Sequence, residues 1–208
     1  MAVEDRIAST APFGRAGLLL VVAAWAVISL TPFGTWLESR LVSHVLVEIP
    51  VLVAIGFVLG RCIEPRLRMV LEPLNGGGIP GILLVTFALA FWMIPRWLDA
   101  SLQAPDVAAA KYISLVALAG MPLAWSWDRL HPVARGLVKI EFLAMYFRLG
   151  WLYLISPDRL CNSYLIDDQV LLGQGLLVVG IALSITWLYP VFFGAWSAPS
   201  PRGQGEAT

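Results

Sequence analysis

A histidine and a carboxylate, two side chains able to bind metals or move protons, lie four positions apart in an apolar segment. They are His44 and Glu48, within residues 43–50. Four residues are about one helical turn, so the two side chains are predicted to share one helix face. Ionisable groups at membrane depth are costly and need a partner, a cavity or a metal ion. The sequence therefore predicts that any chemical site of this protein begins at this pair.

The rest of the chain has the composition of a membrane protein. Of its 208 residues, 59% are hydrophobic and 13% are charged, whereas soluble domains are usually nearer half apolar and a quarter charged. The charged residues separate long apolar runs, which is typical of a polytopic membrane protein. The net charge of zero argues against a nucleic-acid partner. The single cysteines Cys62 and Cys161 fall on opposite sides of the predicted topology, which argues against a disulfide.

We predict an all-α bundle of about six membrane spans, because each apolar run approaches the roughly 20 residues that cross a bilayer. The predicted spans are Arg15–Phe33, Leu41–Gly60, Ile79–Trp97, Val107–Trp127, Pro132–Ile155 and Gln169–Phe193. Residues 1–14 are predicted to form a cytoplasmic segment, residues 15–195 the bundle, and residues 196–208 a disordered cytoplasmic tail.

The distribution of arginines predicts the orientation of these spans. One predicted side carries Arg6, Arg15, Arg61, Arg66, Arg68, Arg129, Arg135 and Arg202, and the other carries Arg40, Arg96 and Arg159. This bias predicts that both termini lie in the cytoplasm, and we expect the bacterial inner membrane as the location. The same topology gathers polar ends of five spans at the outer leaflet.

Several partners are conceivable for these outer polar groups. Glu48 is expected to bond to Arg96 or Arg148, or else to bind a metal. His44 could instead be a simple interfacial histidine. Lys111 is expected to extend toward the membrane surface, and the acidic pair Asp167–Asp168 to lie at a helix N-terminus, where the helix dipole favours it.

The predicted fifth span carries a second polar stripe. Glu141, Met145 and Arg148 recur at spacings of four and three, so they share one face. We expect Glu141 and Arg148 each to have a partner on another helix, because seven residues separate them. The alternatives are an interhelical polar clamp and, less strongly supported, a proton or ion path.

Histidine, glutamate and methionine together are a ligand set that copper accepts. Met93, Met121 and Met145 lie on three different predicted spans, although methionine at helical spacing often only fills a core. No haem site or nucleotide fingerprint is predicted. No nucleophile–base arrangement can be named either, so we predict that the protein is not an enzyme.

Three segments resemble the CtaG-type cytochrome oxidase assembly proteins, which are membrane proteins linked to copper-dependent oxidase maturation. Residues 43–48 are similar to that family's paired-histidine helix, with His44 at the first histidine and Glu48 at the second. Residues 91–100 are similar to its tryptophan-histidine-x-proline segment, with Met93 at the histidine. The resemblance therefore implies His44, Glu48 and Met93 as the metal ligands. Residues 168–175 are similar to the aspartate-glutamine-glycine opening of a late span.

The resemblance implies a divergent member of that family and leaves two main hypotheses. In the first, the protein handles copper or assists assembly of a respiratory oxidase through an outward-facing site. In the second, the metal site is degenerate and the protein is a non-catalytic subunit or scaffold of a larger membrane complex. The absence of the family's further histidines near Lys111 favours the second hypothesis. Transport through Glu141 and Arg148 is a third and weaker hypothesis, since no internal repeat is visible.

Overall fold

The computed structural model describes residues 15–30, 32–62 and 72–193, and every regular element within them is helical. The first half of this fold runs from α2 to α5. Its elements are α2 (Arg15–Leu30), α3 (Pro32–Glu38), α4 (Leu41–Ser43), the π-helical turn η1 (His44–Glu48) and α5 (Ile49–Cys62). The elements α4, η1 and α5 follow one another without a break, so His44 and Glu48 belong to one continuous helical rod.

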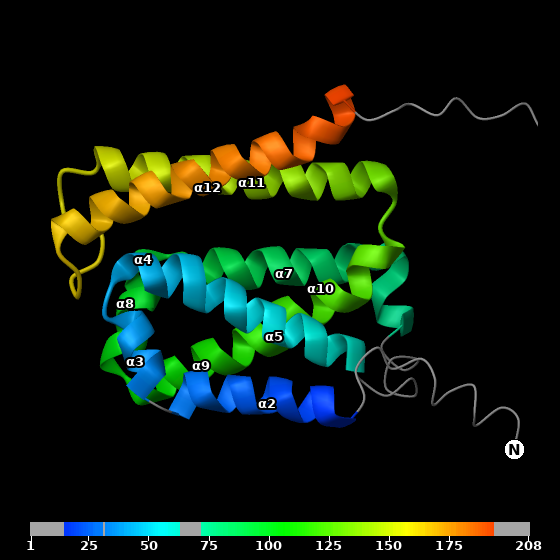
Figure 1. Ribbon diagram of the computed structural model, residues 1–208, viewed down its shortest axis with the longest axis horizontal. Coiled ribbons are helices and arrows are strands. Elements are labelled where there is room, and N and C mark those ends of the chain that lie inside the picture. Colours follow the sequence, from blue (N-terminus) through cyan, green and yellow to red (C-terminus); the bar gives the residue numbers. More distant parts are fainter. Residues whose placement is uncertain (1–14, 31, 63–71, 194–208) are drawn as a thin grey trace, which may run out of the picture.

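The second half continues the helical rods and ends in a long hairpin. Its elements are η2 (Glu72–Gly78), α7 (Ile79–Trp92), α8 (Pro95–Gln103), α9 (Pro105–Ser114), the π-helical turn η3 (Leu115–Gly120), α10 (Met121–Ser126), η4 (Trp127–Arg129), α11 (Pro132–Ile155) and α12 (Ile166–Phe193). Figure 1 shows the α11–α12 hairpin lying along one side of the other helices.

The all-helical class and the membrane character that the sequence predicts are supported by the structure. Among the described residues, four rods are long and apolar enough to cross a membrane: Leu41–Cys62, Pro73–Trp92, Pro105–Arg129 and Ile166–Phe193. The bent pair of α2 and α3 gives a fifth candidate if it forms one span. The 24-residue α11 is long enough, but it carries the charges of Arg135, Lys139, Glu141 and Arg148.

The predicted third span, Ile79–Trp97, is too long at its C-terminal end. The helix α7 ends at Trp92, and a new helix, α8, begins at Pro95. Ile94 between them has an extended backbone, with φ −72° and ψ 121°. A residue before proline avoids the helical region because it clashes with the proline ring. Pro95 therefore starts α8 instead of continuing α7.

Small residues let the two rods that carry the site approach closely. A Cβ atom added to Gly56 of α5 would lie 2.3 Å from the carbonyl oxygen of Val116 in η3. One added to Gly120 would lie 2.5 Å from the Cα atom of Gly56. Backbones in such contact are typical of helix pairs in membranes. The contact fixes α5 against the rod that contains α9, and so fixes His44 relative to Lys111.

The core around this contact is apolar and closed. Leu41, Leu52, Leu115 and Leu172 each have 0% of their surface exposed. These leucines come from α4, α5, η3 and α12, so one core joins the hairpin to the rest of the bundle. The predicted N-terminal segment, residues 1–14, and the predicted tail, residues 196–208, lie outside the described residues.

Candidate functional site

The π-helical turn η1 holds the two residues that the sequence singled out. It spans His44–Glu48, and both side chains have 0% exposure. A single π turn inside an α-helix is rare and is often found at functional sites. The two side chains point into one space, with His44 Nε2 lying 3.9 Å from Glu48 Oε2. The predicted shared face of His44 and Glu48 is therefore confirmed.

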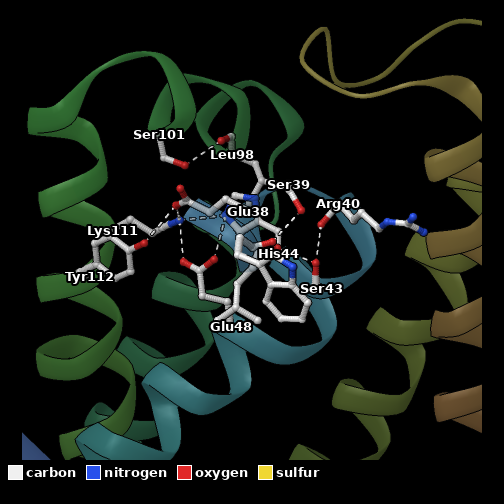
Figure 2. A network of polar contacts seen from close by, with 12 residues as sticks. Glu38, Ser39, Arg40, Ser43, His44, Glu48, Leu98, Ser101, Lys111 and Tyr112 are labelled. Carbon is white, nitrogen blue, oxygen red and sulfur yellow. Dashed lines mark hydrogen bonds and ion pairs between the residues drawn. The ribbon is translucent and has the colours of Figure 1, made fainter. Parts of the chain in front are cut away.

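Four parts of the chain bring polar groups to this space, and we call the resulting group the polar cluster. Its members are Glu38 of α3, His44 and Glu48 of η1, Lys111 and Tyr112 of α9, and Tyr164 of the loop before α12. Figure 2 shows Lys111 reaching from α9 toward Glu38, His44 and Glu48. The cluster lies at the end of the bundle where α3, α4 and α8 meet (Figure 1).

The Lys111 ammonium occupies the centre of the polar cluster. Its Nζ lies 2.6 Å from Glu38 Oε1, 2.8 Å from Glu48 Oε1 and 2.8 Å from His44 Nε2. The lysine side chain is 0% exposed. The expectation that Lys111 extends toward the membrane surface is therefore wrong. The buried Glu48 carboxylate and the partly buried Glu38 carboxylate attract the ammonium inward more strongly than the surface does, because Coulomb attraction is strong where water is excluded.

The hydrogen bonds of Tyr164 determine which nitrogen of His44 carries the proton. The Tyr164 hydroxyl donates to the carbonyl oxygen of Glu38 at 2.7 Å and lies 2.8 Å from His44 Nδ1. A hydroxyl has one proton to donate, so Nδ1–H of His44 must donate to the Tyr164 oxygen. In a neutral imidazole, Nε2 is then the acceptor and takes a hydrogen bond from Lys111. The Nε2 lone pair, through which His44 would bind a metal, thus already accepts a hydrogen bond from Lys111.

The loop of residues 156–165 is held in place so that Tyr164 can reach the cluster. Asp99 of α8 accepts the backbone N–H groups of Asn162 and Ser163 at 3.0 and 2.9 Å. Gln169 of α12 accepts the N–H of Leu160 at 2.9 Å through its side-chain oxygen. Burial, and then the nearby Glu38 and Glu48 carboxylates, raises the pKa of Tyr164 well above its usual range. Its hydroxyl therefore keeps its proton and stays a donor.

The formal charge of the polar cluster is −1 when His44 is neutral, since Glu38, Glu48 and Lys111 contribute −1, −1 and +1. Within the described part of the chain, Glu48 Oε2 has no hydrogen-bond partner. Ligand atoms of Glu38, His44 and Glu48 all lie within 4.8 Å of one another. The cluster therefore carries one uncompensated negative charge, which a further cation or a proton would neutralise.

Met93, the third predicted metal ligand, lies at the end of α7 and lines an apolar cavity together with Val45 and Leu46. Among the His, Cys, Asp and Glu side chains of the described residues, Glu38 joins His44 and Glu48 as a potential ligand. Metal binding by His44, Glu48 and Met93 stays a prediction.

Two predicted partners of Glu48 lie elsewhere. Arg96 is exposed on α8, and Arg148 forms an ion pair with Glu141 of its own helix, with both side chains more than half exposed. The expectation that Glu141 and Arg148 each pair with another helix is therefore wrong. The side chains of Glu141 and Arg148 are long enough to meet across two turns of α11. The sequence-based expectation considered only the distance between their positions on the helix and so did not foresee this contact.

The remaining polar expectations have clear outcomes. Asp167 and Asp168 lie in the first turn of α12, as predicted. Cys62 and Cys161 are both free, in agreement with the prediction against a disulfide.

Sequence reasoning missed Glu38, Tyr112 and Tyr164 as cluster members. Only Glu38 carried a signal, because it is an acid just ahead of the span that holds His44.

Comparison of this chain with protein-family models, with curated proteins and with solved structures finds no match.

Proposed function

We propose that this protein is a non-catalytic structural subunit or scaffold of a larger membrane protein complex. In this proposal the polar cluster is an internal clamp that joins α3, η1, α9 and the loop before α12. The observation that carries it is the position of the Lys111 ammonium, in contact with Glu38, Glu48 and His44. An ammonium at this point repels a metal cation and engages the atoms that would bind it.

The proposal includes six spans with both termini in the cytoplasm of a bacterial inner membrane. The bent pair α2–α3 and the 24-residue α11 supply the two spans beyond the four apolar rods. At about 1.5 Å per residue, α11 is about 36 Å long, enough to cross a bilayer. The first residues of α2 and the last residues of α12 lie at the same end of the molecule (Figure 1), which supports termini on one side.

The ion pair of α11 supports a protein partner. Glu141 and Arg148 are 60% and 65% exposed, and the adjacent Ile140 is 64% exposed. If α11 spans the membrane, this pair faces hydrocarbon, where charged groups are costly. A neighbouring protein that covers the pair with polar groups would remove this cost. The exposed ion pair is thus the expected contact of the chain with its complex.

The test is purification of the tagged full-length chain from its native membranes in mild detergent. We expect a complex of defined composition by size-exclusion chromatography and mass spectrometry. The complex should persist in His44→Ala and dissociate in the double variant Glu141→Leu/Arg148→Leu. A chain that elutes alone, at monomer size and with no partner, would contradict the scaffold proposal.

A second candidate function is metal handling of the oxidase-assembly type, with copper as the expected metal. The convergence of Glu38, His44 and Glu48 within 4.8 Å and the unfilled charge balance favour it. In this proposal Lys111 must release His44 Nε2 before a metal binds. Metal analysis of protein purified from copper-supplemented cells tests it, with His44→Ala and Met93→Ala as comparisons. Absence of stoichiometric metal in the unmodified protein, both oxidised and reduced, would remove this candidate.

A further inference from the structure

An apolar cavity of about 390 Å³ lies between the α11–α12 hairpin and the other helices. Its walls come from the rod η1–α5, from α7 and α10, and from both helices of the hairpin. Among the residues that line it are Val45, Val53, Met93, Met145, Tyr146 and Leu176. The volume falls within the range of about 300–1,000 Å³ that small-molecule sites occupy. The cavity is separate from the polar cluster.

The way the hairpin is fastened explains why space remains there. Near the polar cluster, the hairpin is held by the bonds of Tyr164 to His44 and Glu38 and by those of Asp99 to the loop. α11 itself packs mainly on α12, with Gly150 and Gly173 allowing close contact next to the loop and Gly180 allowing it farther along. The hairpin is thus tied at one end, and the cavity lies beyond that tie.

The chemistry of the lining selects the occupant. The tyrosine hydroxyl of Tyr146 is the one polar side-chain group among the residues that line the cavity. A water molecule needs two to four polar partners, so water is a poor occupant. A transmembrane helix is about 10–12 Å across and needs a groove along the bundle, whereas this space has walls from both layers. A flexible hydrocarbon chain has no polar atoms to satisfy and fits the lining.

We propose that this cavity binds the hydrocarbon tail of a membrane amphiphile, either a lipid acyl chain or a prenyl chain. Pro50 and Ala54 line the cavity and are also exposed, so the tail enters from the side, beside α5. Met93 and Met145 lie in the lining, and methionine adapts its shape to irregular apolar ligands. The tail fills the space that the tied hairpin leaves open and so completes the packing of the two layers.

The test uses full-length protein in lipid nanodiscs with two photoreactive probes in separate arms. One probe is phosphatidylcholine with a diazirine on an acyl tail, and the other is a prenyl quinone with a diazirine on its tail. We expect crosslinks by mass spectrometry at Val53, Met93 and Met145, saturating at one probe per chain. Labelling in one arm alone identifies that kind of tail, and labelling in both supports a site for either.

Variants that fill the cavity provide the decisive comparison. Met145→Trp and, separately, Val53→Trp should lower crosslinking in the cavity by roughly tenfold. The matched control is Ile140→Trp, on the exposed face of α11, which should leave it unchanged. If either cavity variant elutes as aggregate, Ala54→Phe at the entrance replaces it. Labelling that follows exposure alone and is insensitive to the cavity variants, in both arms, would overturn the proposal.

Discussion

Two acid–base pairs of this protein differ in burial and in location although both join a basic side chain to a glutamate. In the polar cluster, Lys111 and Glu48 are 0% exposed and come from different rods of the bundle. In α11, Arg148 and Glu141 are more than half exposed and share one helix. If the first pair separates, a charge is left inside the protein, whereas the second pair lies on the outer face of α11, where a neighbouring molecule can offer it new polar contacts. The comparison indicates that the cluster holds the chain together and that the α11 pair is available to something outside it.

The largest effect is expected from Lys111→Met. It leaves the Glu38 and Glu48 carboxylates without their cation, and breaking a buried ion pair in this way costs about 3–5 kcal/mol. Unfolding in mixed micelles, followed by circular dichroism, measures the change. Lys139→Met is the matched control, because Lys139 lies over the ring of Trp187 at 5.4 Å, a contact worth about 0.5–1 kcal/mol at exposed sites. Equal losses in the two variants would show that the cluster is no clamp.

A smaller loss of stability is expected from Tyr164→Phe. The change removes the donor to the Glu38 carbonyl and the acceptor for His44 Nδ1–H. Leaving buried polar groups unsatisfied costs about 1–3 kcal/mol. The same unfolding assay measures it, with Tyr189→Phe as control, since Tyr189 is 62% exposed. An unchanged unfolding midpoint for Tyr164→Phe would show that the loop before α12 does not contribute to the clamp.

No large loss of stability is expected when the α11 pair is removed from the isolated protein. Glu141→Leu/Arg148→Leu removes both charges together, so neither is left unpaired, and replacing a desolvated ion pair by apolar residues is often neutral or stabilising. The unfolding midpoint of the purified chain should therefore stay close to that of the unmodified protein. A loss of stability as large as that of Lys111→Met would show that the α11 pair also holds the chain together, and it would contradict the distinction between the two pairs.

The smallest effect is expected from Asp99→Asn, which loosens the loop of residues 156–165. The reactivity of the Cys161 thiol in that loop reports on the change. Burial, and then the Asp99 carboxylate, raises the pKa of Cys161 to about 11, so its thiolate is scarce at pH 8 and its alkylation is slow. Cys62 is partly exposed and should react first. Asp99→Asn releases the loop and removes the nearby charge, so Cys161 should react faster and at lower pH. Mass spectrometry of alkylated peptides follows both sites, and equal rates for Cys161 and Cys62 in the unmodified protein would contradict its burial.

Features that depend on local sequence could be predicted from the chain, and features that depend on three-dimensional packing could not. The apolar runs predict helices, and the spacing of His44 and Glu48 predicts one shared face, because both follow from helix geometry. The partner of Glu48 depends on how α9 lies against η1, and nothing near Lys111 in sequence records that contact. Tyr164 is 120 residues from His44 and comes from an irregular loop, where no periodicity exists to place it.

The π-helical turns η1 and η3 have a consequence for how this protein tolerates insertions and deletions. A π turn accommodates one more residue than an α turn of similar length, and each α-helical residue rotates the chain by about 100°. Deleting one residue from the turn would therefore restore α-helical geometry and leave Leu41 close to its present orientation relative to α5. A one-residue deletion within α5 has no such outlet, so it would rotate everything ahead of it by about 100°, and Leu41 would leave the core while Glu38 would leave Lys111. The rod thus tolerates a lost residue at η1 better than at any α-helical position beside it.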